Sequence, residues 1–493
     1  MKKKMLLTAM TLALAMGSVL SACSSSTSPA AESKKPENTA QSNEPVTLEM
    51  WGRWEEANKQ INETIEAFQK KYPNIKVKYT AVPFAQYVAQ TQTAISGNNL
   101  PDIFGAHPNL PVFQLTRLGV IRSLNDLITE EKKKQFYEGT FSEGETMMAG
   151  EVYGLPLFNP MRTSQVMYYN KAVLKKAGLT EKDIPKTWDE LYQFSKKVKE
   201  ATNGEAYGLI VGVKATSQLP LIVQQMATAI TPEVIPDLNV PPFNYKTGKY
   251  QFDSPGIIQS LDYFKKLQDE KLLHPNSVVM SFREGTALME AGKAALVMDG
   301  AFFSNQMKKE QLDDYGVAPL PTLDGKPQYA MYKGGSNASF YVSKGTKHYN
   351  EVKLFLQFMM DELYPKLLRD GIEYSPIMAQ NESTKITHPI AAQALKIQSE
   401  TVKLVPRPFT KNIETLKVAT EMSGKFPKTT LSNIAEGYLS GQLKDVKAAL
   451  TQLSDETNKV FFDSMKKVQS DGGKVSESDY IFPDWQPFQP YKK

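Results

Sequence analysis

The segment 151–191 restricts the possible folds of this chain most strongly, because five short patterns follow one another in it at fixed spacing. They are a strand start at 153–156, an extended connector at 158–163, an apolar strand at 165–170, a helix at 171–177 and a second helix start at 187–190. Gly178 closes the first helix. Thr187-Trp-Asp-Glu190 is a capping box, in which a hydroxyl and a carboxylate satisfy the first free amides of a helix. The segment predicts two strands joined by a loose connector and followed by two helices.

The residues before this segment predict further strands and helices in alternation. Apolar and polar residues alternate at 46–51 and 75–79, as they do in half-buried strands, and 100–105 is a short strand after a turn. Between these strands, apolar residues recur at helical spacing over 61–72 and 84–95. Strands that alternate with helices indicate a parallel sheet with helices on its faces.

The order of patterns in 151–191 resembles the extracellular solute-binding proteins of the maltose-binding type. These proteins are the substrate receptors of ATP-driven sugar importers. The resemblance continues in AFQKKYPNIKV and LPDIFGAHP before the segment, and in ALMEAGKAALVMDGAFF and YGVAPLP after it. It extends over nearly all of residues 46–465 and is weak over 205–250.

The resemblance implies an α/β, two-lobed periplasmic-binding-protein-like fold of type II. Each lobe is expected to be a mainly parallel sheet flanked by helices, and a hinge of about three crossings joins the lobes. The implied first lobe is 46–160 plus 335–372, and the second is 163–332 plus 376–493. Hinge motion is expected near 159–163, 333–335 and 372–375, where the adjacent glycines of the second crossing allow backbone rotation.

Candidate ligand-binding residues follow two strands of the first lobe. In open parallel sheets, ligands bind beyond the carboxyl ends of the strands. Arg53, Trp54 and Glu55 follow the first strand, and His107 follows the third. Trp54 could stack on a sugar ring, and the other three could form hydrogen bonds to hydroxyl groups. The alternative is that Trp54 packs at the start of a helix and the charged groups are solvated.

In the second lobe, the resemblance implies that Phe302 or Phe303 stacks on the sugar. A rigid aromatic ring buries the apolar face of a sugar at low entropic cost. The alternative is a pair of core residues, and we expect one of the two to pack inward, with Phe302 facing the ligand.

The crossings contribute Asn159, Arg162, Tyr332 and Lys333 as further candidates. If Arg162 and Lys333 converge with Arg53 and His107, an acidic oligosaccharide such as a uronide becomes a candidate ligand, because guanidinium pairs well with carboxylate. The alternative is that these four are rim charges that point into water.

The amino terminus has the features of a lipoprotein export signal. Lys2 to Lys4 precede an apolar stretch from Met5 to Leu20, which has the length of a signal peptide and is short for a membrane span. Leu-Ser-Ala-Cys23 resembles the bacterial lipobox, so residues 1–22 are expected to be removed and Cys23 to carry acyl chains. Residues 23–45 would then be a flexible tether. The alternative is an ordinary export signal that contains a cysteine.

Composition and motifs leave little room for other functions. Without the three N-terminal lysines the formal charge falls from +5 to +2, which gives a nucleic-acid partner little support. The single cysteine allows no internal disulfide, and the four histidines lack metal-ligand spacing. No phosphate loop or nucleophile elbow is present, so we expect no metal, no cofactor and no catalysis.

The sequence therefore predicts a monomeric, lipid-anchored receptor on the extracellular face of a bacterial membrane. It would capture a carbohydrate, most simply an oligosaccharide, and deliver it to a permease powered by a separate ATPase. Two alternatives stay open. One is a secreted glycoside hydrolase, which needs only two carboxylates and leaves no motif. The other is a binding protein for a peptide or a polyamine.

Overall fold

The computed structural model describes most of the chain after the amino-terminal segment. The described ranges are 45–106, 110–162, 164–213, 219–237, 240–280, 282–307, 313–325, 331–333 and 339–491. The expected signal segment, Cys23, His107 and the glycine pair of the second crossing lie outside these ranges.

The first lobe is built on a five-stranded sheet with the order β2-β1-β3-β15-β6. Its strands are β1 (Val46–Gly52), β2 (Ile75–Ala81), β3 (Ile103–Gly105), β6 (Gly154–Leu155) and β15 (Phe340–Val342). The predicted alternation of β1 is present, because every second residue from Val46 to Met50 is buried. β1 pairs in parallel with β2 and β3, and only β15 runs in the opposite direction.

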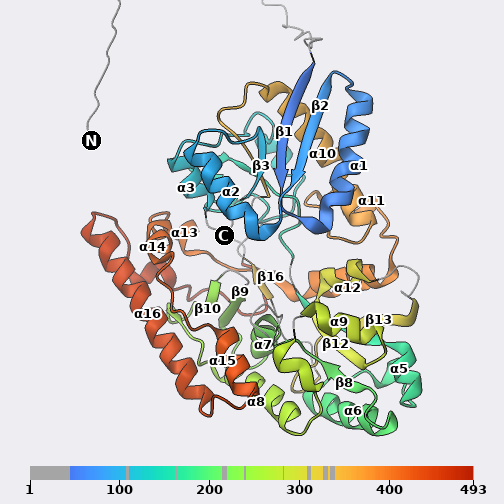
Figure 1. The fold of residues 1–493 in the computed structure, drawn as a ribbon. Coiled ribbons are helices and arrows are strands. Elements are labelled where there is room, and N and C mark those ends of the chain that lie inside the picture. Colours follow the sequence, from blue (N-terminus) through green and yellow to red (C-terminus); the bar gives the residue numbers. More distant parts are fainter. Residues whose placement is uncertain are drawn as a thin grey trace, which may run out of the picture. The chain divides into compact units, whose positions relative to one another are not determined.

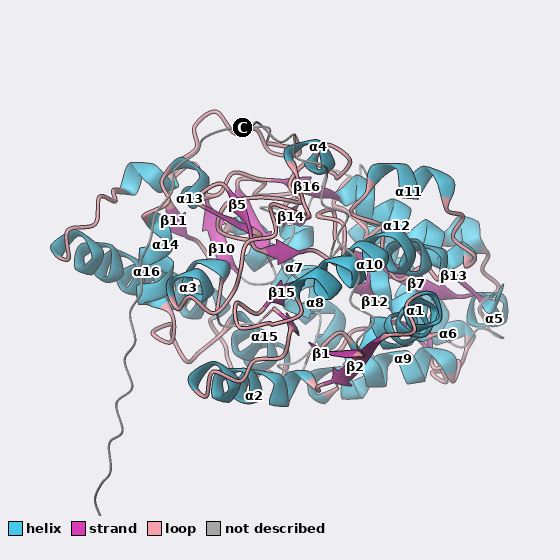
Figure 2. Ribbon diagram, turned by 90° about the horizontal axis from the view of Figure 1, so that it is seen from above, coloured by secondary structure: helices cyan, strands magenta, loops and turns pink. Residues whose placement is uncertain are grey.

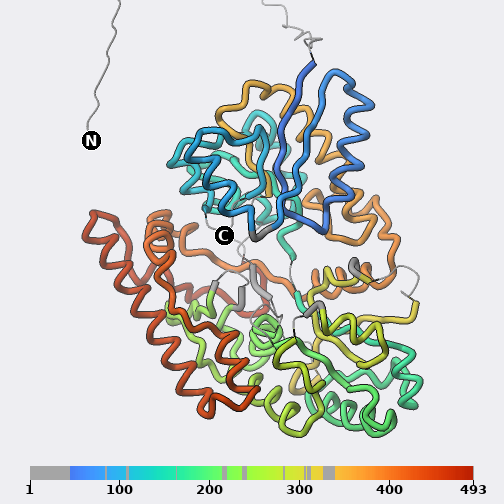
Figure 3. Tube along the Cα trace, viewed as in Figure 1, coloured from blue at the N-terminus to red at the C-terminus, as the bar shows by residue number. Residues whose placement is uncertain are grey.

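Helices pack on this sheet from widely separated parts of the sequence. They are α1 (Asn58–Lys71), α2 (Phe84–Ser96), α3 (Val112–Arg117), α4 (Glu130–Lys133), α10 (Tyr349–Arg369) and α11 (Met378–Ser383). α1 lies against α10, where the rings of Phe68 and Phe355 are 4.9 Å apart, and Figure 3 shows the orange trace of α10 among the blue elements. Met378 N donates to Gln135 O, so α11 lies with the first lobe, slightly beyond the expected boundary at 376.

The second lobe is built on a four-stranded sheet with the order β13-β7-β12-β8. Its strands are β7 (Gln165–Asn170), β8 (Tyr207–Ile210), β12 (Ala294–Gly300) and β13 (Tyr315–Ala318). Only β7 is reversed relative to the other three. In both sheets the reversed strand, β7 or β15, is the one that follows a crossing. A chain that arrives from the other lobe enters at the edge where the remaining strands end.

The helices of the second lobe form an apolar core with this sheet. They are α5 (Lys171–Lys176), α6 (Trp188–Ala201), α7 (Leu219–Ala227), α8 (Pro255–Asp269), α9 (Phe282–Glu290), the short 3-10 helix η4 (Ala301–Gln306) and α12 (Pro389–Thr401). The predicted capping box opens α6, since the Thr187 side chain accepts from Glu190 N and the Glu190 carboxylate accepts from Thr187 N. Figure 2 shows the strands in magenta with helices in cyan around them.

The rest of the chain forms a further layer beside this core. It contains the antiparallel sheet of β9 (Val234–Asp237), β10 (Val240–Asn244) and β11 (Lys249–Tyr250), the short pairing of β14 (Met331–Lys333) with β16 (Val402–Leu404), and the helices α13 (Pro408–Lys411), α14 (Thr415–Met422), α15 (Leu431–Leu439) and α16 (Val446–Ser470) (Figure 1). Phe482 N donates to Tyr245 O, and Trp485 is 1% exposed. The carboxy-terminal segment 475–491 and the proline-rich insertion 231–250 therefore share one core.

Candidate functional site

The strand register places the candidate residues beside the crossings. Gly105 at the end of β3 and Leu155 at the end of β6 both pair with Phe340 at the start of β15. Gly300 at the end of β12 pairs with Gln165 at the start of β7. Residues that follow the carboxyl ends of the strands therefore lie at the edge where the chain passes between the lobes.

Trp54 lies in the core of the first lobe, so the prediction that it stacks on a ligand is wrong. Its side chain is 6% exposed, and its ring meets Phe340 edge-on at 5.0 Å. A Cβ atom on Gly105 would lie 3.1 Å from the ring, so the missing side chain there makes room for it. Tertiary packing across β3 and β15 covers the tryptophan, in agreement with the alternative that it packs.

Arg53 joins the ends of two strands. Its Nε donates to Ala106 O at 2.8 Å, and its guanidinium lies 4.6 Å from the centre of the Trp54 ring. Burial lowers the pKa of Arg53. Glu55 begins the short 3-10 helix Glu55–Ala57 and is exposed. Arg53 thus has a structural role at this edge, and Glu55 is solvated.

The two adjacent phenylalanines of η4 have different environments. Phe303 is fully buried and meets Tyr168 edge-on at 5.1 Å, so it belongs to the core and its assignment as a ligand-binding residue is wrong. Phe302 is half-buried. Its ring folds back over Gly300, where a Cβ atom would lie 2.2 Å from the ring. The missing side chain of Gly300, at the end of β12, therefore leaves room for the ring of Phe302.

The first and third crossings are tied together by Asn159. Its backbone N donates to Tyr374 O at 3.2 Å, its Nδ2 donates to Ser375 O at 3.2 Å, and its Oδ1 accepts from Met161 N at 2.7 Å. The side chain is 4% exposed. These contacts make Asn159 a structural link between the crossings.

Tyr332 and Lys333 lie on β14, where their backbones pair with β16.

Arg162 bridges two carboxylates from different parts of the fold. Its Nη2 lies 3.1 Å from Glu56 Oε1, at the start of the first lobe, and its Nε lies 3.3 Å from Glu373 Oε2, on the third crossing. The guanidinium also covers the ring of Phe158 at 3.8 Å. The positive charge of Arg162, which was a candidate for binding the ligand, is therefore balanced by carboxylates of the protein itself.

Glu373 and Gln398 complete this hinge network, and sequence reasoning missed both. Glu373 is 1% exposed; its Oε1 accepts from Gln398 Nε2 at 2.8 Å, and Gln398 Oε1 accepts from Ser164 N at 3.3 Å. Burial raises the pKa of Glu373 to about 7 against the opposing effect of Arg162. The sequence signal that could have pointed to Glu373 was a single carboxylate in a crossing segment of mostly small and apolar residues.

Asp299 is a second buried carboxylate at the edge of the second lobe. Its Oδ1 accepts from Gly300 N at 2.6 Å, and its Oδ2 has no hydrogen-bond partner among the described residues. Burial raises the pKa of Asp299 to about 7. Asp299 is the second-last residue of β12, and Phe302 lies in η4, which follows directly.

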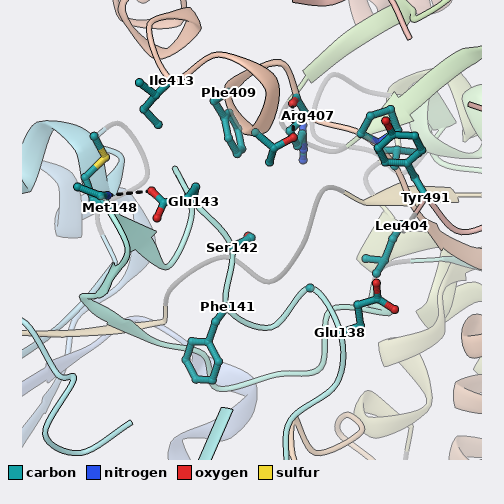
Figure 4. A pocket seen from close by; sticks show the side chains of 15 residues that line it. Glu138, Phe141, Ser142, Glu143, Met148, Leu404, Arg407, Phe409, Ile413 and Tyr491 are labelled. Carbon is teal, nitrogen blue, oxygen red and sulfur yellow. Dashed lines mark hydrogen bonds between the residues drawn. The ribbon is translucent and has the colours of Figure 1, made fainter. Parts of the chain in front are cut away.

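A cavity of about 640 Å³ has walls from both lobes. The first lobe contributes residues 138, 139, 141–143, 148 and 149. The second lobe contributes residues 404–407, 409, 410 and 413 together with Tyr491. Figure 4 shows Ile413, Phe409 and Arg407 along one side and Phe141, Ser142 and Glu138 along the other. The volume falls within the roughly 300–1,000 Å³ of typical ligand pockets.

The wall from the first lobe is held by a tight turn. Ala149 and Gly150 both have positive φ angles, and their backbone N–H groups donate to the two carboxylate oxygens of Glu143 at 2.9 and 2.6 Å. One of these bonds is the dashed line in Figure 4. Sequence analysis named none of the residues around this cavity. Their signal was weak, because aromatic and proline residues in 404–413 are equally typical of loops.

Comparison with known proteins places this architecture in a family. The model of the bacterial extracellular solute-binding proteins matches residues 52–362, which is more than half of the chain. The chain belongs to this family. The expected family is therefore confirmed.

Among its relatives, this solute-binding protein is similar to two proteins of Bacillus subtilis. The arabinooligosaccharide-binding protein is 27% identical over 305 residues, which are 60% of this chain and 65% of the relative. The maltodextrin-binding protein MdxE is 25% identical over 361 residues, which are 71% of this chain and 74% of the relative.

Solved structures share the fold. The sugar-binding protein MalE of Xanthomonas citri aligns with a TM-score of 0.59 at 18% identity and covers 86% of this chain and 99% of its own. A solute-binding protein of Thermotoga lettingae bound to α-D-tagatose aligns with a TM-score of 0.63 at 19% identity, with coverage of 84% and 100%. The expected two-lobed α/β fold is confirmed.

Two features of the described ranges bear on its setting. No helix in them combines the length and the apolar character needed to cross a lipid bilayer. The same ranges hold no group of three or more histidine, cysteine, aspartate or glutamate side chains arranged to bind a metal ion.

Proposed function

We propose that this protein captures a carbohydrate in the cavity between its lobes and delivers it to a membrane permease driven by a separate ATPase. The observation that carries the proposal is the cavity of about 640 Å³, because residues of both lobes line it. The family and the names of its relatives, which include arabinooligosaccharide- and maltodextrin-binding proteins, support a carbohydrate ligand.

The walls of this cavity suit a sugar. Phe141, Phe409 and Tyr491 provide aromatic surface for the apolar faces of sugar rings, and the Thr410 hydroxyl, which donates to Arg407 O at 2.8 Å, can accept a hydrogen bond. A ligand that contacts both walls binds the closed arrangement more tightly than the open one. This difference in affinity is what shifts the lobes toward closure.

The charges around the cavity favour a neutral oligosaccharide over a uronide. Glu138, Glu143 and Arg407 line it, and Arg407 lies 3.9 Å from Glu145, so carboxylates outnumber guanidinium groups. Arg53 and Arg162, which sequence analysis considered for an acidic ligand, are occupied by Ala106 O and by two carboxylates. A carboxylate on the ligand would meet repulsion here.

Anchoring and partners complete the proposal. Cleavage before Cys23 and acylation of its thiol would hold the protein on the extracellular face of the membrane, with residues 23–45 as a tether. Two or more acyl chains are needed for stable attachment. The protein would work as a monomer and without a cofactor.

A thermal-shift panel tests the proposal. The purified protein is melted with neutral malto-, arabino-, xylo- and chito-oligosaccharides, with oligouronides, and with a peptide and a polyamine. A neutral oligosaccharide should raise the melting temperature, because a ligand at a hundred times its Kd stabilises the folded state by about 2.7 kcal/mol.

Two variants locate the effect. Phe409→Ala should reduce the shift, whereas Leu118→Ala, at a side chain 56% exposed and outside the cavity, should leave it unchanged. A panel in which only the peptide or the polyamine raises the melting temperature would refute a carbohydrate ligand. Release of reducing ends from the oligosaccharides would favour the alternative of a glycoside hydrolase.

A further inference from the structure

A second cavity, of about 490 Å³, lies beside the first. Arg407 and Phe409 line both cavities, so the two share a wall. The second cavity also has walls from both lobes, since α3 of the first lobe and α14 of the second contribute to it. The sheet β10–β11 and the carboxy-terminal segment add the remaining surface.

Phe409 stands at the boundary between the cavities. Its ring packs on the backbone of Gly144 in the first lobe, where a Cβ atom would lie 2.9 Å from the ring. The φ angle of Gly144 is +77°, which a residue with a side chain rarely adopts. The close approach of the two lobes at this point therefore depends on a glycine facing a half-buried aromatic ring.

Further contacts join the lobes around the second cavity. Gln114 Nε2 donates to Thr420 Oγ1 at 3.5 Å, and Glu145 lies 3.9 Å from Arg407. Among the described residues that line the second cavity, Glu145 and Arg407 are the charged ones, and they face each other. A ligand in this space would therefore meet little net charge.

The second cavity is rich in aromatic side chains. Phe113, Phe243, Tyr245, Tyr250, Phe426 and Tyr480 are among its walls. Phe426 is 41% exposed, so part of its ring is accessible to a ligand in this cavity. Aromatic surface beside hydroxyl and amide groups is the chemistry that binds neutral sugar rings.

We propose that the second cavity is an extension subsite that holds the distal units of an oligosaccharide whose other units fill the first cavity. The saccharide passes beside Phe409, which contacts the units on both sides. This inference rests on the proposed function and adds to it a ligand class, a neutral oligosaccharide too long for the first cavity alone. It also gives the 231–250 insertion and the carboxy-terminal segment a role as walls of the site.

Isothermal titration calorimetry with oligosaccharides of increasing length tests the proposal. The probes are the di- to octasaccharides of whichever neutral series, malto-, arabino-, xylo- or chito-, raises the melting temperature. Affinity of the unaltered protein should rise with length beyond the units that fill the first cavity. Phe426→Ala should weaken binding of the longest saccharides by about three- to tenfold and leave the disaccharide unchanged.

A second variant and a control make the result specific. Phe113→Ala should show the same dependence on length, whereas Leu323→Ala, at a side chain 49% exposed that lines neither cavity, should bind every length as the unaltered protein does. Equal affinity for all lengths, or an equal loss for all lengths in Phe426→Ala, would overturn the extension subsite while leaving the proposed function in place. If no saccharide of any length bound, both proposals would fail.

Discussion

Glu373 is the residue whose environment links the lobes most directly. It is buried on the third crossing and contacts Arg162 on the first, which in turn reaches Glu56 in the first lobe. Removing this carboxylate from water costs more than Arg162 and its hydrogen-bond partners recover, and the pKa of Glu373 rises to about 7. Glu373 therefore binds a proton more readily in the folded than in the unfolded chain.

This raised pKa predicts that stability falls as the pH rises. Between the unfolded pKa near 4.5 and the folded pKa near 7, the folded chain holds more protons, so each step upward in pH favours unfolding. The contribution of Glu373 is at most about 3 kcal/mol over this window. Urea unfolding at a series of pH values from 5 to 8 should show the decline, and Glu373→Gln should make it shallower.

Asp299 provides a second, independent test of this pH dependence. Its pKa is also raised to about 7 by burial, so Asp299→Asn should likewise reduce the decline. Asp299 lies apart from the contacts of Arg162, so the two substitutions together should remove more of the pH dependence than either alone. An unchanged pH profile in Glu373→Gln would show that this carboxyl does not titrate in the window.

The phenylalanine pair gives a second prediction for single residues. Phe303→Ala should destabilise the fold by about 3–5 kcal/mol, because it empties a filled core position. Phe302→Ala should cost less stability, since its ring is only half-buried, and should leave the affinity for the oligosaccharide unchanged, because Phe302 lines neither cavity. Urea unfolding and calorimetry of both variants measure the two effects.

The pair also separates the two interpretations of this segment. If Phe302→Ala weakened binding, the sugar would reach beyond the two cavities to this ring, as the resemblance implies, and the placement of the ligand in the cavities alone would be wrong. The resemblance alone did not distinguish the two rings, and the inward position of Phe303 became clear only from its packing on Tyr168. The absent side chain of Gly105 gives Trp54 room in the core, and the sequence does not show this, because Gly105 ends β3 whereas Trp54 follows β1, about fifty residues earlier.

Elements with local signals were predicted well. The strand 165–170 and the capping box at Thr187 are where the sequence places them, because alternation, composition and capping act within a few residues. The antiparallel sheet of 234–250 was not predicted, because its packing on α16 and on the carboxy-terminal segment joins residues more than two hundred positions apart.

The link between crossings predicts a coupled effect on stability and binding. Asn159→Ala removes the donor to Ser375 O and the acceptor for Met161 N, and unpaired buried groups cost about 1–3 kcal/mol. We expect this loss in urea unfolding, together with oligosaccharide binding weakened several-fold because the crossings are less well fixed.

A helix cap offers the comparison for this variant. Thr187→Ala removes the cap of α6 and should cost about 1 kcal/mol without changing the affinity. Normal affinity in Asn159→Ala, despite its lower stability, would show that the contact between crossings does not influence the binding arrangement.

The complete fold joins the two lobes by two kinds of contact. The crossings carry the buried network of Asn159, Arg162 and Glu373, and the cavity walls carry contacts that join residues 114 and 144–145 to 407–420. Crossings of this kind allow a hinge motion, and the contacts between the cavity walls would then break and form with it. A ligand that bridges both walls stabilises the closed arrangement.

The distance between the lobes in solution tests this account most directly. Spin labels at Arg117→Cys and Ser440→Cys, on exposed positions of α3 and the end of α15, can be introduced with Cys23→Ser, which removes the single native cysteine. Pulsed electron spin resonance then gives the distance distribution with and without the oligosaccharide selected by the thermal-shift panel. We predict that a saturating oligosaccharide shortens and narrows the distribution. An identical distribution with and without the bound saccharide would contradict closure of the lobes on a ligand.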